Sequence, residues 1–98
     1  MEYTVALQNL DSWANDIKKF TQSLKSQPFA NQDQYDAHND MLMIIQLFNR
    51  CLEQLHKEST LCRQRKKTTA NFEKLYCRAI KYQQTVEHNR VMYNLMFG

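Results

Sequence analysis

Cysteine and histidine are among the side chains that most often bind a metal ion or act as nucleophiles, and the chain has three of each. Cys51, His56 and Cys62 come closest to a ligand set. On a helix of about 100° per residue, however, Cys51 and His56 would point about 140° apart and could not share one ion. The sequence also has no Gly-rich phosphate loop, no His-Glu-x-x-His pair and no Cys-x-x-Cys pair. We therefore expect no metal site, no cofactor and no catalytic residues.

One pair of residues leaves an enzymatic alternative open. Arg50 and His56 are separated by five residues. This spacing resembles the Arg-x(4–6)-His motif of HEPN-type helical ribonucleases, in which two protomers contribute the pair and act on the RNA 2′-hydroxyl and the scissile phosphate. The resemblance covers seven residues, and Cys51 stands where a polar residue usually follows the arginine. It implies a ribonuclease in which Arg50 and His56 are catalytic, and this is the third of three functional hypotheses.

Basic side chains are concentrated in one segment. Residues 57–82 carry eight basic and two acidic side chains, a net charge of +6, whereas residues 1–56 carry four basic and seven acidic ones, a net charge of −3. On a helical wheel, five of the basic residues fall within a sector of about 60°. We call these five the basic ridge: Arg63, Lys67, Lys74, Arg78 and Lys81.

The basic ridge has three interpretations. If it lay on one helix, it would be about 27 Å long and could follow a phosphate backbone. It could instead orient an acidic protein partner, or it could be an ordinary solvated helix face. Proteins that bind single-stranded nucleic acid usually expose aromatic side chains among the basic ones. Here the nearby aromatic residues Phe72, Tyr76 and Tyr82 fall on the apolar face instead, which favours a protein partner.

The segment 41–48 is apolar on almost every side. Met41, Ile44, Ile45 and Phe48 continue the core-facing stripe of their helix, but three other residues point elsewhere. These three are Leu42, Met43 and Leu47. An exposed apolar patch often marks a protein interface, and flexible methionines suit one. We expect the three to bind a protein and to form a homodimer, unless a neighbouring helix covers them.

The elements that must position these side chains are helices. Between Asn31 and Phe97 there is no glycine or proline, the residues that end helices and form tight turns. Apolar residues recur every three or four positions, which predicts helices over about residues 4–26, 32–58 and 61–96. Pro28 ends the first, and Asn31 is a suitable N-cap for the second. The second break lies at Ser59-Thr60 or as late as residues 68–70, because hydroxyl residues favour helix starts.

The apolar stripes also predict how the helices pack. If the second and third segments were one helix, their stripes would face nearly opposite ways and leave apolar surface in water. A turn removes the conflict and predicts an all-α, up-down-up antiparallel three-helix bundle, a single domain over residues 1–98. We expect its centre to bury Trp13, Ile17, Phe48, Leu52, Leu75 and Ala79.

The composition of the chain also indicates where in the cell the protein is expected. No apolar run approaches the length of a membrane span, the first residues do not resemble a signal peptide, and an odd number of cysteines argues against a disulfide framework. We expect a cytosolic location, with signal-less delivery into another cell as the alternative. The favoured hypothesis is a non-enzymatic adaptor, inhibitor or chaperone-like module that binds an acidic protein. Nucleic-acid binding through the basic ridge is the second hypothesis.

Overall fold

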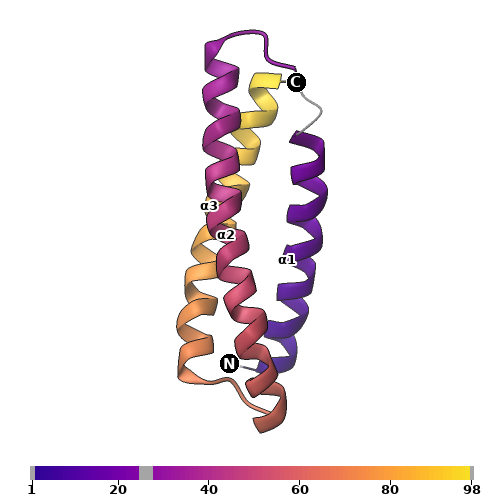
Figure 1. Cartoon of the computed structure of the whole chain (residues 1–98), viewed down its shortest axis with the longest axis vertical. Helices are drawn as coiled ribbons and strands as arrows, with labels where there is room; N and C mark the ends of the chain where they lie inside the picture. Colours follow the sequence, from indigo (N-terminus) through magenta and orange to yellow (C-terminus); the bar gives the residue numbers. More distant parts are fainter. Residues whose placement is uncertain (1, 25–27, 98) are drawn as a thin grey trace.

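The computed structural model describes residues 2–24 and 28–97 and contains three helices within them. These are α1 (Tyr3–Leu24), α2 (Gln32–Arg65) and α3 (Ala70–Phe97). Figure 1 shows α1 and α3 running in one direction with α2 antiparallel to them, which confirms the up-down-up three-helix bundle. With 34 residues at about 1.5 Å each, α2 alone accounts for the 51 Å length of the molecule. Residues 25 and 26 of the predicted first helix lie outside the described residues.

Both ends of α2 have the caps that a long helix needs. Asn31 has an extended backbone, and its side-chain oxygen accepts a hydrogen bond from the Gln34 N–H at 2.9 Å. At the other end Lys66 adopts the left-handed conformation (φ 55°), and its N–H bonds to the Cys62 carbonyl. This conformation is usual just after a helix but is normally filled by glycine. The predicted N-cap is therefore confirmed. At the end of α2, Lys66 occupies the left-handed position although its Cβ makes that conformation less favourable than it would be for glycine.

The predicted end of the second helix at residue 58 and the start of the third at residue 61 are wrong. The helix α2 continues through this segment because Ser59 donates its hydroxyl to the His56 carbonyl (2.6 Å) instead of capping a new helix. Ser59 and Cys62 are also buried, so the segment packs in the core rather than turning. The break falls at the later predicted position, where the Thr69 hydroxyl accepts a hydrogen bond from the Phe72 N–H at 3.0 Å and caps α3.

The core runs the length of the bundle and draws on all three helices. It includes the predicted central residues Ile17, Phe48, Leu52, Leu75 and Ala79. Trp13 is only half-buried, contrary to expectation, because it lies at the edge between α1 and α3. The centre of its ring is 6.0 Å from that of Phe48 and 5.4 Å from that of Tyr76. A ring of this size can fill the gap between two helices while one edge stays in water.

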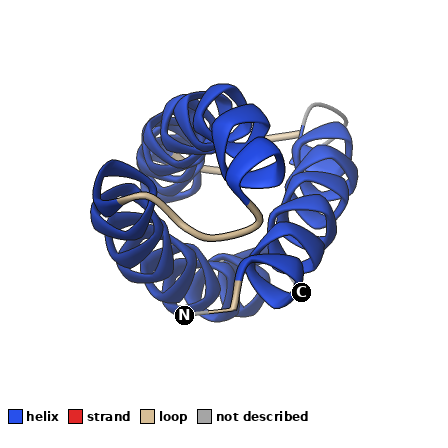
Figure 2. Cartoon of the chain, turned by 90° about the horizontal axis from the view of Figure 1, so that it is seen from below, coloured by secondary structure: helices blue, strands red, loops and turns tan. Residues whose placement is uncertain are grey.

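Large side chains join α1 to α3. Besides the Trp13–Tyr76 stack, Asn9 donates an amide N–H to the Tyr76 hydroxyl at 2.7 Å. Arg90 lies 4.6 Å from the centre of the Phe20 ring and forms an ion pair with Asp16 at 3.2 Å. The end-on view shows the three helices enclosing a common centre (Figure 2). The backbones of α2 and α3 approach each other more often than those of α1 and α2, and the backbones of α1 and α3 hardly meet.

Among the described residues, no helix has both the length and the apolar character that crossing a membrane requires.

Candidate protein-binding surface

The described residues contain no group of three His, Cys, Asp or Glu side chains that could hold a metal ion. The thiols are free: Cys51 and Cys62 are buried, and Cys77 is exposed. The Cys51 thiol donates to the Leu75 carbonyl (3.4 Å), and burial raises its pKa while the nearby Arg78 charge lowers it by a smaller amount. A protonated, hydrogen-bonded Cys51 therefore helps hold α2 against α3.

Arg50 and His56 are both exposed on α2. Six positions along a helix place them about 120° apart around its axis, so within one chain they point in different directions. Arg50 lies at the edge that α2 shares with α3, where it lines a cavity together with Arg78 and Tyr82. His56 does not line that cavity. A ribonuclease site built from this pair therefore stays a prediction.

The basic ridge is not one continuous surface, because the helix break divides it. Arg63 lies on α2 and Lys67 in the turn after it, whereas Lys74, Arg78 and Lys81 lie on α3. The condition for a straight ridge about 27 Å long, a single helix from residue 63 to residue 81, is therefore not met. Of the basic ridge, only the three cations of α3 lie together on one helix.

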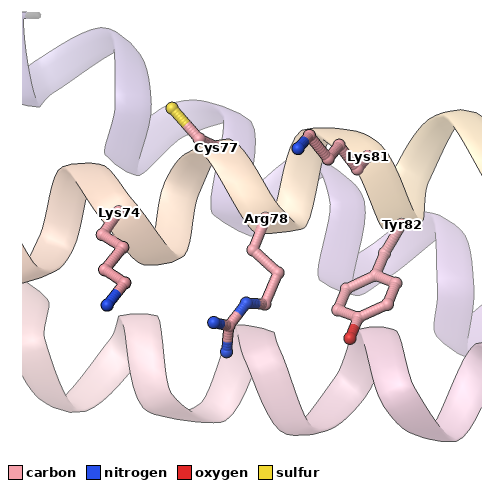
Figure 3. Close-up of a pocket in the computed structure, with 5 residues that line it drawn as sticks. All are labelled: Lys74, Cys77, Arg78, Lys81 and Tyr82. Atoms are coloured by element: carbon pink, nitrogen blue, oxygen red, sulfur yellow. The ribbon is translucent and has the colours of Figure 1, made fainter.

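These three cations border a hollow on the surface of α3, and every residue that lines it belongs to that helix. With Cys77 and Tyr82, they line an open cavity of about 480 Å³, and Lys74, Arg78 and Tyr82 project toward α2 (Figure 3). A second cavity of about 170 Å³ shares Arg78 and Tyr82 with the first and is lined by residues of both α2 and α3. We call the combined surface the α2–α3 groove, and its lining residues on α2 are Leu47, Arg50, Cys51 and Gln54.

The groove is strongly basic and its charges are unpaired within the described part of the chain. Arg50, Lys74, Arg78 and Lys81 are exposed. The ion pairs that the structure describes belong to Arg90, on another side of α3. Four cations beside one groove repel one another, and an anionic surface placed there would relieve that repulsion.

Two of the three predicted apolar contact residues are exposed beside this groove. Met43 is 57% exposed and Leu47 is 38% exposed. Leu42 is half-buried and packs against the core, so the expectation that it belongs to an exposed surface is wrong. It differs from the other two because α2 has helices on two sides, and its buried arc is wider than one apolar stripe.

A second exposed apolar cluster was not anticipated. Near the end of α3, Val91, Met92 and Leu95 are 61%, 53% and 75% exposed, and Met96 lies beside them. The signal was available, because six of the seven residues from Val91 to Phe97 are apolar. A helix with apolar residues on every side cannot bury them all in a three-helix bundle. We call this set the C-terminal cluster.

The molecule thus presents an exposed apolar pair beside a basic groove, and a separate C-terminal cluster. Both are made by side chains on helices, not on loops. No protein-family model matches the chain, and neither a curated protein nor a solved structure matches it.

Proposed function

We propose that this chain is a non-enzymatic protein–protein interaction module that binds an acidic protein surface with the α2–α3 groove and the adjacent Met43 and Leu47. The observation that carries the proposal is the juxtaposition of exposed apolar side chains with cations that have no acidic partner among the described residues. Exposed apolar side chains bordered by polar or charged ones are the arrangement found at protein–protein interaction sites.

The two parts of the surface would do different work. Burial of Met43 and Leu47 would supply affinity, about 1.5–3 kcal/mol for each side chain that becomes fully covered. The groove cations Arg50, Lys74, Arg78 and Lys81 would speed the encounter with an acidic surface and set its orientation. Arg50 and Leu47 line the same cavity, so a partner seated there would meet both parts at once.

Nucleic acid is the competing partner for the same cations. The division of the basic ridge by the turn at residues 66–69 weakens that hypothesis, because a phosphate backbone needs a continuous track of charge. The aromatic ring in the groove, Tyr82, is half-buried and offers little face for stacking with a base. Nucleic-acid binding is therefore one outcome of the test below.

Affinity capture with tagged chains tests the proposal. The parent chain, a Met43→Glu/Leu47→Glu variant and a Gln8→Glu control are used to capture proteins from nuclease-treated extracts of the host, with identification by mass spectrometry. Gln8 is exposed on α1, away from the groove. We expect a protein that the parent and the control retain and the double variant loses. Retention by all three, or loss after nuclease treatment, would contradict the proposal.

A further inference from the structure

The outer face of α2 carries an ordered pattern of exposed residues spaced alternately by three and four positions. Its first part is acidic, with Asp33, Asp36 and Asp40. Its middle is the apolar pair Met43 and Leu47, and its last part has Arg50, Gln54 and Lys57. We call this row the α2 stripe; it is about 36 Å long. Alternating steps of three and four are the spacing with which one helix packs along another.

The fold of a single chain does not account for this pattern. A helix dipole favours acidic residues in the first turn, which includes Asp33. That effect does not reach Asp36 and Asp40, or the cations Arg50 and Lys57 in the helix interior. None of these charges forms an ion pair within the described residues. The pattern runs from acidic through apolar to basic. A second copy placed antiparallel to the first would therefore set its acidic part opposite the basic part of the first and the two apolar pairs opposite each other.

We propose that the α2 stripe packs antiparallel against the α2 stripe of a second copy of this chain, about a two-fold axis that passes between Met43 and Leu47. This inference rests on the proposed function and identifies its acidic partner surface as another copy's Asp33–Asp40 segment. In this register, positions whose numbers add up to 90 face each other. Met43 then faces Leu47, Asp40 faces Arg50, Asp33 faces Lys57, and Asp36 faces the amide of Gln54.

Other arrangements of the same helix are less favourable. In a parallel pair each position faces itself, so carboxylates would face carboxylates and Arg50 would face Arg50. An antiparallel pair shifted by one heptad would place Leu47 opposite Arg50 and Asp36 opposite Leu61. Of these three arrangements, only the proposed register brings the apolar pairs of the two copies together. It also places a basic side chain or an amide opposite every carboxylate of the stripe. Two-fold pairing of one surface with itself is also the commonest way in which proteins form dimers.

The groove cations of α3 strengthen the same arrangement. Arg78 and Arg50 line one cavity, so they lie at the same level of the bundle. A second copy's Asp40, placed opposite Arg50, would therefore lie between two guanidinium groups. A carboxylate between two arginines forms charge-assisted hydrogen bonds, which are the stronger kind. The inference thus explains why Arg78 is left without an acidic partner in a single chain.

Exchange of charges between two variants tests the register. Asp40→Arg places like charges at both Asp40–Arg50 contacts, and Arg50→Asp does the same with the opposite sign. Each variant alone should dissociate at least tenfold more readily than the parent in sedimentation equilibrium or in size exclusion with light scattering. An equimolar mixture should recover a heterodimer, because both contacts then join opposite charges. Asp11→Arg, an exposed change on α1, is the matched control and should behave as the parent.

The inference is overturned if the parent is monomeric at several hundred micromolar, if either single variant dimerises as the parent does, or if the mixture stays monomeric. Circular dichroism should show unchanged helix content in all variants, because exposed charges contribute little to stability. A monomeric parent that still captures a protein from extracts, and loses it with the Met43→Glu/Leu47→Glu variant, would leave the proposed function standing with a different partner.

Discussion

Phe48→Ala tests the packing of the bundle at its centre. Phe48 is fully buried on α2, and the centre of its ring lies 6.0 Å from the centre of the Trp13 ring on α1. Truncation removes the ring and leaves a cavity, because the three surrounding helices can relax only partly. Comparable Phe→Ala changes in protein cores cost about 3–5 kcal/mol.

That cost is large against the stability of the whole chain. A domain of 98 residues is expected to have a free energy of unfolding of about 5–15 kcal/mol. At about 4–8 °C for each kcal/mol in a domain of this size, Phe48→Ala should lower Tm by at least about 12 °C. Leu52→Ala, at another buried position of α2, should cost about 2–5 kcal/mol.

We would measure the stability of each variant in two ways. Thermal melts are followed by circular dichroism, and urea titrations are followed by the fluorescence of the single tryptophan. The protein concentration must be the same for every variant, since association would add to apparent stability. Val5→Ala is the control, because Val5 is 50% exposed on α1, outside the groove and the α2 stripe, and its truncation should cost far less. If both Phe48→Ala and Leu52→Ala change Tm by less than a few degrees, the assigned core is wrong.

Three further predictions follow from single residues. Lys66→Gly should raise the free energy of unfolding by about 1 kcal/mol in urea titrations, because glycine adopts the left-handed conformation without the Cβ penalty; a fall would contradict the cap geometry. Burial raises the pKa of the Cys51 thiol above its ordinary value of 9.0, so the folded chain holds this proton more tightly than the unfolded chain does. Stability should therefore decline as pH rises from about 9 through the folded pKa, and Cys51→Ala should flatten that decline. A thiol reagent should modify Cys77 quickly and the buried Cys51 and Cys62 only at the rate of unfolding; three equally fast thiols would refute the burial.

The fold could be predicted from sequence because apolar spacing reports which face of a helix is buried. The exact turn between α2 and α3 could not, since Ser59-Thr60 and Thr68-Thr69 are equally good helix starts by residue type. Tertiary contacts decide between them. Glu58 accepts hydrogen bonds from the Thr69 hydroxyl (2.9 Å) and the Asn71 amide (3.2 Å), and it can do so only if α2 passes residue 58 before the chain turns back.

The candidate surface was predictable only in part. Met43 and Leu47 were found because a helical wheel identifies apolar residues that leave the core stripe. Leu42 was misplaced because the wheel does not show how far a second neighbouring helix extends the buried arc. The groove could not be foreseen, because Arg50 and Arg78 are distant in sequence and meet only once α3 folds back on α2.

The unequal attachment of the helices has a consequence for how the molecule opens. The helix α2 packs along α3 at close backbone range, whereas α1 has fewer close contacts with α2 and reaches α3 mainly through side chains such as Trp13 and Phe20. Regions with fewer close contacts open at lower free energy than the rest of a protein. Backbone amides of α1 should therefore exchange with deuterium sooner than those of the α2–α3 hairpin. Because the groove and the α2 stripe belong to that hairpin, we expect both to persist through such an opening, so that binding at these surfaces does not require α1 to stay packed.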